Sequence, residues 1–341
     1  MSGWQQRLLI ALAILIPLAL ITVLVSVAIG PVWIPLKDVA AVLLHRAGSD
    51  GEVGQRYYAI ITQLRWPRIT MGMTVGAALA VAGAALQGLL RNPLADPYTL
   101  GISSGAAAGA CLSLIFLVPH FGNLIYFVPV LSFVAGIITL TVVFYLARID
   151  RRLQAETLVL AGIVVNTFMS SVISFLLTMA GENVHELIYW MMGSLALRKG
   201  EYAIVVAIIL LAGVLVLWLE GRHLNILTLG DEEAHWLGVS VERTRKIILV
   251  AASLLTGAAV SVAGSIGFVG LVIPHMCRMV VGPDYRILIP VTAFSGGIFL
   301  VWADNLARTI FAPLELPVGV VTSFLGVPFF IYLLRRSRKE G

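Results

Sequence analysis

Charged side chains are scarce in this sequence. Asp, Glu, Lys and Arg together make up 12% of the 341 residues, whereas hydrophobic residues make up 59%, and the mean hydropathy is +0.97. A water-soluble chain of this length needs far more polar surface. The composition excludes a soluble protein and predicts an all-α polytopic membrane protein, because a helix satisfies its own backbone hydrogen bonds in lipid.

Ionisable groups are also missing from most of the apolar runs. Ion-coupled carriers generally need buried carboxylates or histidines to relay protons or cations. An ion-coupled secondary transporter is therefore the disfavoured alternative function, and the energy for transport must come from elsewhere. The runs without any Asp, Glu, Lys, Arg or His are 69–90, 100–118, 125–147, 158–179, 202–219 and 247–266.

Motifs for catalysis and for nucleotide or metal binding are absent from the sequence. No lysine follows a glycine, which excludes the GK[ST] loop that holds phosphate in many ATPases. The six histidines are scattered, and Cys111 and Cys277 lie in apolar runs, where packing is the simplest role. We predict no catalytic residue, no metal site and no cofactor, which also disfavours a membrane-embedded enzyme.

What the sequence does contain is a series of about ten apolar runs. A membrane-spanning helix needs about 20 apolar residues, and only the run 268–281 is clearly short. The first run is longer than the core of a signal peptide, so we expect it to be retained. The predicted spans are 8–29, 69–90, 100–118, 125–147, 158–179, 202–219, 247–266, 268–281, 287–303 and 316–334.

The formal net charge of +5 reflects the loops between these spans. Basic residues mark the cytoplasmic loops of membrane proteins. With the N-terminus inside, most of the Lys and Arg residues fall in inner segments. We therefore predict a multi-pass protein of the inner (cytoplasmic) membrane with both termini in the cytoplasm, and no nucleic-acid partner.

Two polar segments interrupt the spans. Residues 30–68 leave the membrane on the outer side, with an amphipathic interfacial helix in VWIPLKDVAAVLLH, and Arg65 and Arg68 at the end of this segment have either an anchoring or a functional role. Residues 220–246 are the most charge-rich long segment of the chain. This segment follows the sixth span on the inner face, where we expect a docking surface with a helix that starts at Asp231.

An internal repeat relates the two halves of the chain. Residues 76–83 read GAALAVAG and residues 257–264 read GAAVSVAG, and at the same offset Pro93 meets Pro274. By the span count the first copy runs inward and the second outward, so spans 2 to 5 and 7 to 10 form an inverted repeat, as in many transporters. The small residues of the first copy predict close helix packing.

Several motifs together resemble the FecCD family of permease subunits of bacterial ABC importers, which includes vitamin B12, heme and ferric siderophore permeases. The resemblance covers nearly the whole chain and implies a single permease domain over residues 1–341 with ten spans. The motifs are LRWPRI, GAALAVAGAALQGLLRNPLADPYTLG, LVLAG, YWMMGSL, LGDEEAHWLG, GFVGLVIPHMCR and ELPVGVVTSFLGVPFF.

The resemblance implies roles for three groups of residues. Arg65, Arg68 and Arg308 correspond to outer arginines that pair with glutamates of a substrate-binding protein. Ala155 and Glu156 correspond to the cytoplasmic gate, where the acidic Glu156 departs from the small hydroxyl residues of the vitamin B12 permease. The residues that correspond to the loop coupled to the ATPase are Leu229, Gly230, Asp231, Glu232, Ala234, Leu237 and Gly238.

The implied partners follow from the same resemblance. They are two copies of an ABC ATPase subunit, a periplasmic or lipid-anchored substrate-binding protein, and a second permease subunit, with a homodimer favoured over a heterodimer. The implied cargo is an iron chelate, with ferric siderophore ahead of heme, or cobalamin. The chain itself is expected to be a transport subunit and not an enzyme.

Overall fold

The structure, a computed structural model, describes residues 3–44, 52–121, 127–149, 152–153, 155–196 and 200–340. These residues are predominantly helical, as the composition predicts. The strands in this part of the chain are two residues each, β1 (Arg148–Ile149) and β2 (Arg152–Leu153), and pair antiparallel with Arg148 opposite Leu153.

Each of the ten predicted runs coincides with an apolar helix. Within the described residues, seven helices are long and apolar enough to cross a membrane, and three apolar helices are shorter. The seven are α1 (Gly3–Ala28), a continuous helix that ends with α4 (Trp66–Leu89), α7 (Val128–Leu146), α8 (Ala155–Met179), α10 (Gly200–Leu219), α13 (Val241–Ala263) and α15 (Tyr285–Thr309). The three are α5 (Ile102–Leu112) with η3 (Ser113–Leu117), α14 (Val269–Val281) and the apolar part of α16 (Val318–Glu340).

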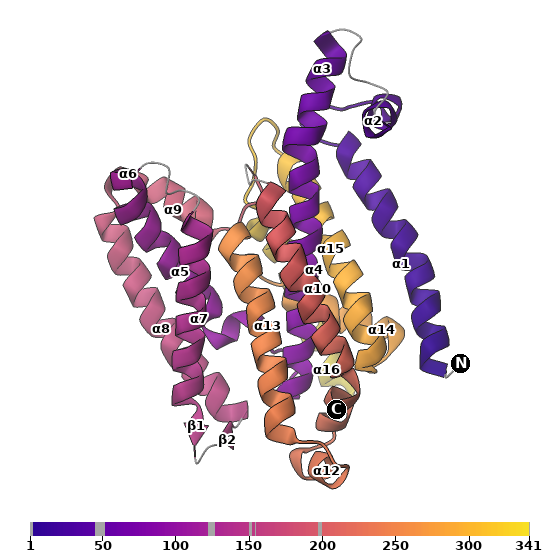
Figure 1. Cartoon of the computed structure of the whole chain (residues 1–341), viewed down its shortest axis with the longest axis vertical. Helices are drawn as coiled ribbons and strands as arrows, with labels where there is room; N and C mark the ends of the chain where they lie inside the picture. Colours follow the sequence, from indigo (N-terminus) through magenta and orange to yellow (C-terminus); the bar gives the residue numbers. More distant parts are fainter. Residues whose placement is uncertain are drawn as a thin grey trace.

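The second span starts much earlier than its apolar run. α3 (Glu52–Ala59), the π-helical turn η1 (Ile60–Arg65) and α4 form one helix that extends beyond the rest of the bundle (Figure 1). Pro67 is tolerated near the start of α4 because the wider turns of η1 change the hydrogen-bonding pattern there. The outer segment 30–68 thus holds α2 (Leu36–Leu43), close to the predicted interfacial helix, and an extension of the span.

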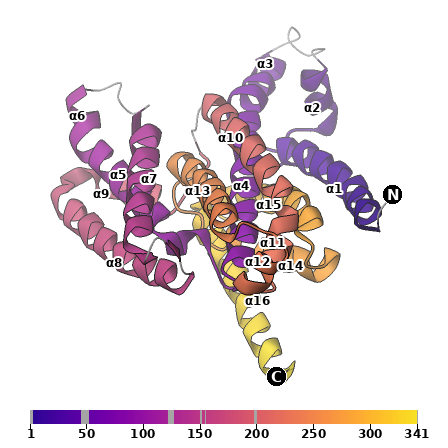
Figure 2. The ribbon, with the colours of Figure 1, turned by 60° about the horizontal axis from the view of Figure 1, so that its bottom comes forward.

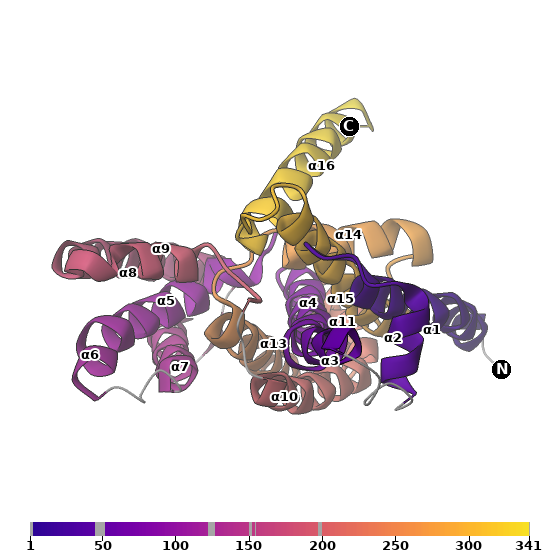
Figure 3. The same ribbon diagram turned by 90° about the horizontal axis from the view of Figure 1, so that it is seen from above.

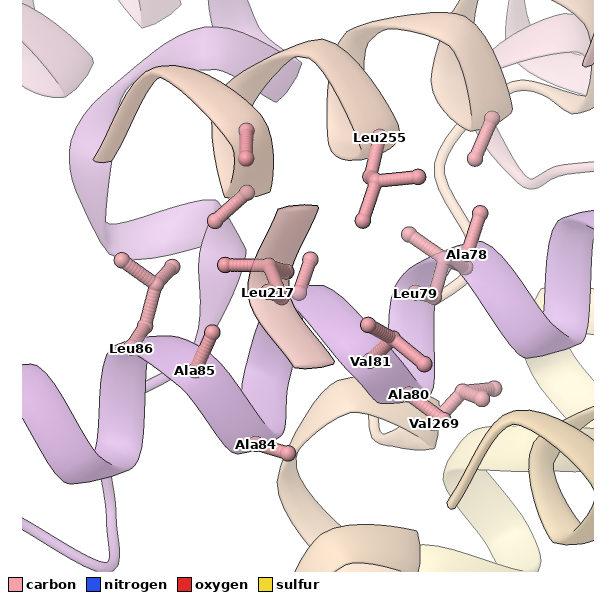
Figure 4. Close-up of a cluster of buried hydrophobic side chains, with 14 of the residues drawn as sticks. Ala78, Leu79, Ala80, Val81, Ala84, Ala85, Leu86, Leu217, Leu255 and Val269 are labelled. Atoms are coloured by element: carbon pink, nitrogen blue, oxygen red, sulfur yellow. The ribbon is translucent and has the colours of Figure 1, made fainter. Parts of the chain in front are cut away.

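α4 lies at the centre of the bundle and is almost entirely buried. Figure 4 shows its alanine and leucine side chains packed among residues of α10, α13 and α14. Gly83 faces Gly270 of α14 and Gly76 faces Gly296 of α15, so that a Cβ on either α4 glycine would overlap a backbone atom of the neighbouring helix. The close packing predicted for these small residues is confirmed.

The two halves of the chain have the same sequence of helices in opposite orientation. α4, α5, α7 and α8 form the first half, and α13, α14, α15 and α16 form the second. α4 and α13 run in opposite directions along the bundle (Figure 1), and the second helix of each half is a short one. These features agree with the predicted inverted repeat.

The backbone between α13 and α14 is not helical, whereas Pro274 lies inside α14, which continues through it. Residues 264–268 are not helical, and Phe268 has a positive φ of 67° immediately before α14. Protein groups cover the freed backbone: the N–H of Ile266 donates to the Tyr98 hydroxyl at 2.6 Å, and the N–H of Ser194 donates to the carbonyl of Ala263 at 2.8 Å. Irregular backbone at membrane depth requires such partners.

The bundle has two chemically different ends. One end carries α2, α3, α6 (Val118–Phe121) and α9 (Val184–Met191), which follows η5 (Gly181–Asn183), and we call it the α2 end. The opposite end carries β1, β2 and α12 (Asp231–Trp236), and we call it the α12 end. The start of α1 and the last turns of α16 both lie towards the α12 end (Figures 1 and 2). Which end faces the cytoplasm stays a prediction.

Seen along the bundle, the helices form two groups (Figure 3). α5 to α9 lie in one group, and α1, α4, α10, α14 and α15 lie in the other. α13 lies between them and contacts both α4 and α7. α16 contacts α14 and α15 and extends away from the rest of the bundle (Figures 2 and 3).

Candidate functional site

The charged segment 220–246 folds into two short helices at the α12 end. α11 (Gly221–Leu227) is followed by α12, which begins at Asp231 as the sequence predicts. Gly230 precedes it with a φ of 148°, a conformation that favours glycine. Three acidic residues fill the first turn of α12, where they interact favourably with the positive end of the helix dipole.

α12 is attached to the bundle through its buried side. The Ala234 side chain is fully buried in the main hydrophobic core, and the carbonyl of Ala234 accepts a 2.9 Å hydrogen bond from the N–H of Val239. On α11, Leu224 and Leu227 are also buried in this core. The segment is therefore a packed part of the fold and not a loose connector.

Asp231 forms ion pairs with two arginines from different parts of the chain. Its carboxylate lies 2.5 Å from Nη2 of Arg91, in the turn after α4, and 2.8 Å from Nη2 of Arg245 on α13. Because Arg245 is buried and Arg91 belongs to the end of the central helix, these contacts connect the start of α12 to the core of the bundle. Asp231 is therefore a positioning residue for α12 in this structure.

Exposed apolar side chains lie at the end of α12 and directly beside this helix, and we call them the α12 apolar edge. It consists of Leu229, Trp236 and Leu237, which are 64%, 86% and 60% exposed. Glu232 and Gly238 are exposed beside them, and Gly238 has a positive φ of 80°. The sequence prediction named two of the three edge residues and missed Trp236, although a tryptophan in a polar loop is itself a signal for an interface.

Arg65 lies at the α2 end, and its guanidinium is buried against the end of α1. It donates hydrogen bonds to the carbonyls of Val27 at 2.6 Å, Ala28 at 3.0 Å and Val32. Arg65 is 5% exposed. The last carbonyls of a helix have no hydrogen-bond partner within the helix. In this conformation the Arg65 side chain therefore caps the C-terminus of α1.

Arg68 and Arg308 lie next to Arg65 and contact two carboxylates. Arg68 binds Asp304 and Glu315, each at 2.8 Å, and its side chain is 12% exposed. Arg308 donates to the carbonyl of Ser26 at 2.8 Å and to the side chain of Asn305, while its Nε lies 3.9 Å from Asp304. Asp304 and Arg308, which are four residues apart on α15, thus form an ion pair, but Arg68 is the closer partner of Asp304.

The three arginines and the two carboxylates form what we call the outer arginine cluster. It contains one more positive than negative side chain, and its three arginines and Glu315 line a cavity of about 430 Å³ at the α2 end. The structure thus brings Arg65, Arg68 and Arg308 together, as the resemblance implies, but occupies much of their hydrogen-bonding capacity with contacts inside the chain. Their role in docking a binding protein stays a prediction.

The gate residues lie at the start of α8, directly after the β1–β2 hairpin. Ala155 is the first residue of α8, and its side chain lies outside the described residues. Glu156 is exposed in the first turn. The structure places both residues at the α12 end, near the surface where a cytoplasmic gate is predicted.

The part of the chain that the structure describes contains no group of three His, Cys, Asp or Glu side chains that could hold a metal ion. The α12 apolar edge presents a tryptophan and two leucines next to acidic residues, and the outer arginine cluster has an excess of positive charge.

Comparison with known proteins agrees with these features. The chain is 42% identical over 296 residues to the cobalamin import system permease protein BtuC of Halobacterium salinarum, covering 87% of this chain and 79% of that protein. It is also 42% identical over 283 residues to the hemin transport system permease protein HmuU of Yersinia pestis, covering 81% and 83%. A solved inward-facing structure of an ABC transporter, assigned to the metal-chelate type, superposes with a TM-score of 0.82 at 30% identity, covering 95% of this chain and 98% of that one. Residues 18–336 match the FecCD transport family, and the chain belongs to this family of ABC importer permeases.

Proposed function

We propose that the whole chain, residues 1–341, is a permease domain that carries an iron chelate, either ferric siderophore or heme, or cobalamin across the inner membrane. The observation that carries the proposal is membership of the FecCD transport family together with the exposed α12 apolar edge. The two relatives named for cobalamin and for hemin are equally similar to this chain, so identity alone does not choose between their cargoes.

The energy is supplied by a separate ATPase that docks on the α12 apolar edge. Exposed tryptophan and leucine side chains on a packed helix are typical of the centre of a protein interface. The neighbouring Glu232 provides a charged rim that sets the orientation of docking. One ATPase per permease chain then gives two ATPase subunits for a permease dimer, and movement of α12 is transmitted to α4 through Asp231 and Arg91.

The second permease subunit packs against the apolar faces of α8 and α16. Phe168 and Phe175 on α8 are 63% and 62% exposed, and Phe324 and Tyr332 on α16 are 75% and 56% exposed. α16 packs against α14 and α15 and extends away from the bundle (Figure 3), so that its exposed face can reach a second chain together with that of α8. A homodimer encloses the transport path between the two copies of α8, with Ala155 and Glu156 at its cytoplasmic end.

A substrate-binding protein docks at the α2 end near the outer arginine cluster. Acidic lobes of a binding protein are attracted by its excess positive charge, mainly through the association rate. Since Arg65, Arg68 and Arg308 also hold the fold together, docking experiments need variants that keep the charge, such as Arg68→Lys. If increasing salt weakens docking at concentrations that still leave the unfolding temperature of the permease unchanged, the result would support a role for the cluster.

The test of the function is purification of the chain from its native membrane, followed by an ATPase assay. The expected result is a co-purifying ATPase whose hydrolysis rate is stimulated by one binding protein loaded with its chelate. Comparison of ferric siderophores, heme and cobalamin identifies the cargo. Transport by the lone chain in proteoliposomes under an ion gradient, without nucleotide hydrolysis, would instead support the secondary transporter.

A further inference from the structure

The second half of α1 is fastened to the bundle by polar side-chain contacts. The Trp302 indole N–H donates to the Thr22 hydroxyl at 3.2 Å, and the Asn305 amide donates to the Ser26 hydroxyl at 2.6 Å. The buried residues of this helix are also confined to that half, namely Ala19, Thr22, Ser26, Val27 and Ala28.

Leu8, Ala11 and Leu15 in the first half of α1 pack against the main core, and an open apolar groove of about 1010 Å³ lies beside them between α1, α14 and α15. α1 lies at the edge of the bundle beside these two helices (Figures 1 and 3). From α1 the groove is lined by Ile10, Ile14 and Leu18, and from the other helices by residues such as Met276 and Phe299. In a membrane, a groove of this size between apolar helices is filled by the molecules that surround the protein. The residues that line the groove indicate which molecules these are.

The length of the groove corresponds to one leaflet of a bilayer. Arg7 and Leu18 are the first and last α1 residues that line it. At 1.5 Å per residue these positions are about 16 Å apart along the helix, and half of a typical hydrocarbon core is about 15 Å. An acyl chain that starts at Arg7 thus ends near Leu18, close to where Trp302 meets Thr22 and closes the groove.

The end of the groove at Arg7 opens into a polar cavity of about 520 Å³. Arg7, Val281 and Gly282 line both spaces, and Asn225 and Asp284 line the polar one.

Arg7 is the uncompensated charge where these two spaces meet. The carboxylate of Asp284 is already neutralised by Arg286, whose Nη2 lies 2.6 Å from it and whose guanidinium stacks on Trp4 at 4.7 Å. Arg7 is exposed and has no hydrogen bond or ion pair with any described residue. The junction of the two cavities therefore carries an excess positive charge.

We propose that the groove binds one anionic phospholipid from the leaflet at the α12 end, with its acyl chains along α1 and its phosphate group at Arg7. An apolar slot of leaflet length that ends at a cation matches the amphipathic shape and the charge of such a lipid. The bound lipid adds to the contacts that Leu8, Ala11 and Leu15 already make between the first half of α1 and the bundle. The site lies at the edge of the bundle away from α8 and therefore does not compete with the proposed permease dimer.

The experiment is native mass spectrometry of the full chain, purified with its co-expressed subunits, during titration with phosphatidylglycerol or with phosphatidylcholine. The expected result for the wild type is one tightly retained phosphatidylglycerol per permease chain and weaker retention of phosphatidylcholine. Arg7→Gln is expected to raise the Kd for phosphatidylglycerol about fivefold, since one basic residue contributes about that factor near an anionic headgroup. The Kd for phosphatidylcholine should change little in this variant.

Two matched controls separate the groove from general effects. Arg222→Gln removes an exposed charge at the same end of the protein but outside the groove, and it should leave lipid retention unchanged. Ile14→Trp fills the groove and should reduce the retention of both lipids, whereas Ile16→Trp, on a face of α1 outside the groove, should not.

Three outcomes would overturn the proposal. These are equal effects of Arg7→Gln and Arg222→Gln, lipid retention that is insensitive to Ile14→Trp, and a lipid-free permease dimer whose formation is blocked by Ile14→Trp. The last outcome would assign the groove to a second copy of this chain.

Discussion

Arg91 and Asp231, which are 140 positions apart in the sequence, form an ion pair between the end of the central helix α4 and the first residue of α12. Arg91 adopts a positive φ of 50°, which turns the chain directly after α4. The same carboxylate binds Arg245 of α13. One residue at the α12 end thus connects the predicted ATPase contact to a helix from each half of the inverted repeat.

The first prediction concerns Asp231→Asn, which weakens both ion pairs while keeping the size of the side chain. Because Asp231 and Arg91 are partly exposed, the free energy of unfolding should fall by no more than about 1 kcal/mol. Transport per ATP hydrolysed, measured in proteoliposomes, should fall several-fold because α12 is no longer held to α4. Glu232→Gln on the exposed side of α12 changes docking but not positioning, so it should lower ATPase affinity and leave transport per ATP hydrolysed unchanged. An equal loss of transport per ATP in Glu232→Gln would assign the effect of Asp231→Asn to docking instead of positioning.

The second prediction is that Trp236→Ala weakens ATPase association at least about tenfold, the effect of losing an aromatic hot spot of about 2 kcal/mol. Trp236 is almost fully exposed, so its replacement should leave the unfolding temperature of the permease unchanged. Association is measured by titrating purified ATPase onto the permease in detergent. Trp33→Ala removes an exposed tryptophan at the α2 end and should have no effect. Wild-type affinity of Trp236→Ala would remove the α12 apolar edge from the interface.

The third prediction concerns Arg68, whose replacement by alanine leaves the Asp304 carboxylate buried without its closest cation. The side chain of Asp304 is only 4% exposed, and breaking a buried ion pair typically costs about 3–5 kcal/mol. Arg68→Ala should therefore unfold at a clearly lower temperature in detergent. The double variant Arg68→Met with Asp304→Asn should recover part of this loss, because the buried carboxylate of Asp304 is removed together with its closest cation, while Arg308 keeps its hydrogen bonds to Ser26 and Asn305. If the double variant is as unstable as Arg68→Ala, packing of the Arg68 side chain is the main contribution.

The fourth prediction concerns Asp96, between α4 and η2 (Pro97–Leu100), where burial raises the carboxyl pKa to about 6 although the N–H of Tyr98 donates to it at 2.9 Å. A raised pKa in the folded state means that the folded protein binds the proton more tightly than the unfolded chain. The contribution of Asp96 to stability should therefore be greatest below pH 4 and should fall as the pH rises from about 4 to 6, by at most about 3 kcal/mol.

Asp96→Asn keeps an acceptor for Tyr98 and removes the titration. The variant should be more stable than the wild type at pH 7.5, and the two unfolding temperatures should converge towards pH 4. Asp38→Asn, on α2, is a control that removes a carboxylate from the α2 end, and it should not flatten the profile. Parallel pH profiles for the wild type and Asp96→Asn would contradict the prediction.

The fifth prediction concerns Gly83, which faces the backbone of Gly270 so closely that no Cβ fits without movement of α4 or α14. Gly83→Ala should lower the free energy of unfolding by about 1–3 kcal/mol, as is typical of overpacked cores. Gly54 on α3 has no neighbouring atom within 4 Å of an added Cβ. Gly54→Ala should therefore be neutral or slightly stabilising, because alanine favours the helix.

The sequence predicted the helices well because the signal for a span is local. An apolar run of sufficient length must be helical in lipid, and every predicted run coincides with a helix. The start of the second span was predicted less well, since α3 and η1 continue the helix outside the apolar run. Hydropathy locates the part of a helix that lies in lipid and contains no information about how far the helix extends beyond it.

The sequence by itself determined the all-α membrane class, the ten apolar helices, the inverted repeat and the helix start at Asp231, because composition and short motifs suffice for each of these. Only the tertiary structure decided which charges neutralise one another, as in Arg68 with Asp304 and Arg91 with Asp231. Such pairs join residues more than 100 positions apart, and their partners depend on how whole helices pack. The same holds for the exposure of Trp236 and for the groove beside α1, since both are defined by what the rest of the chain does not cover.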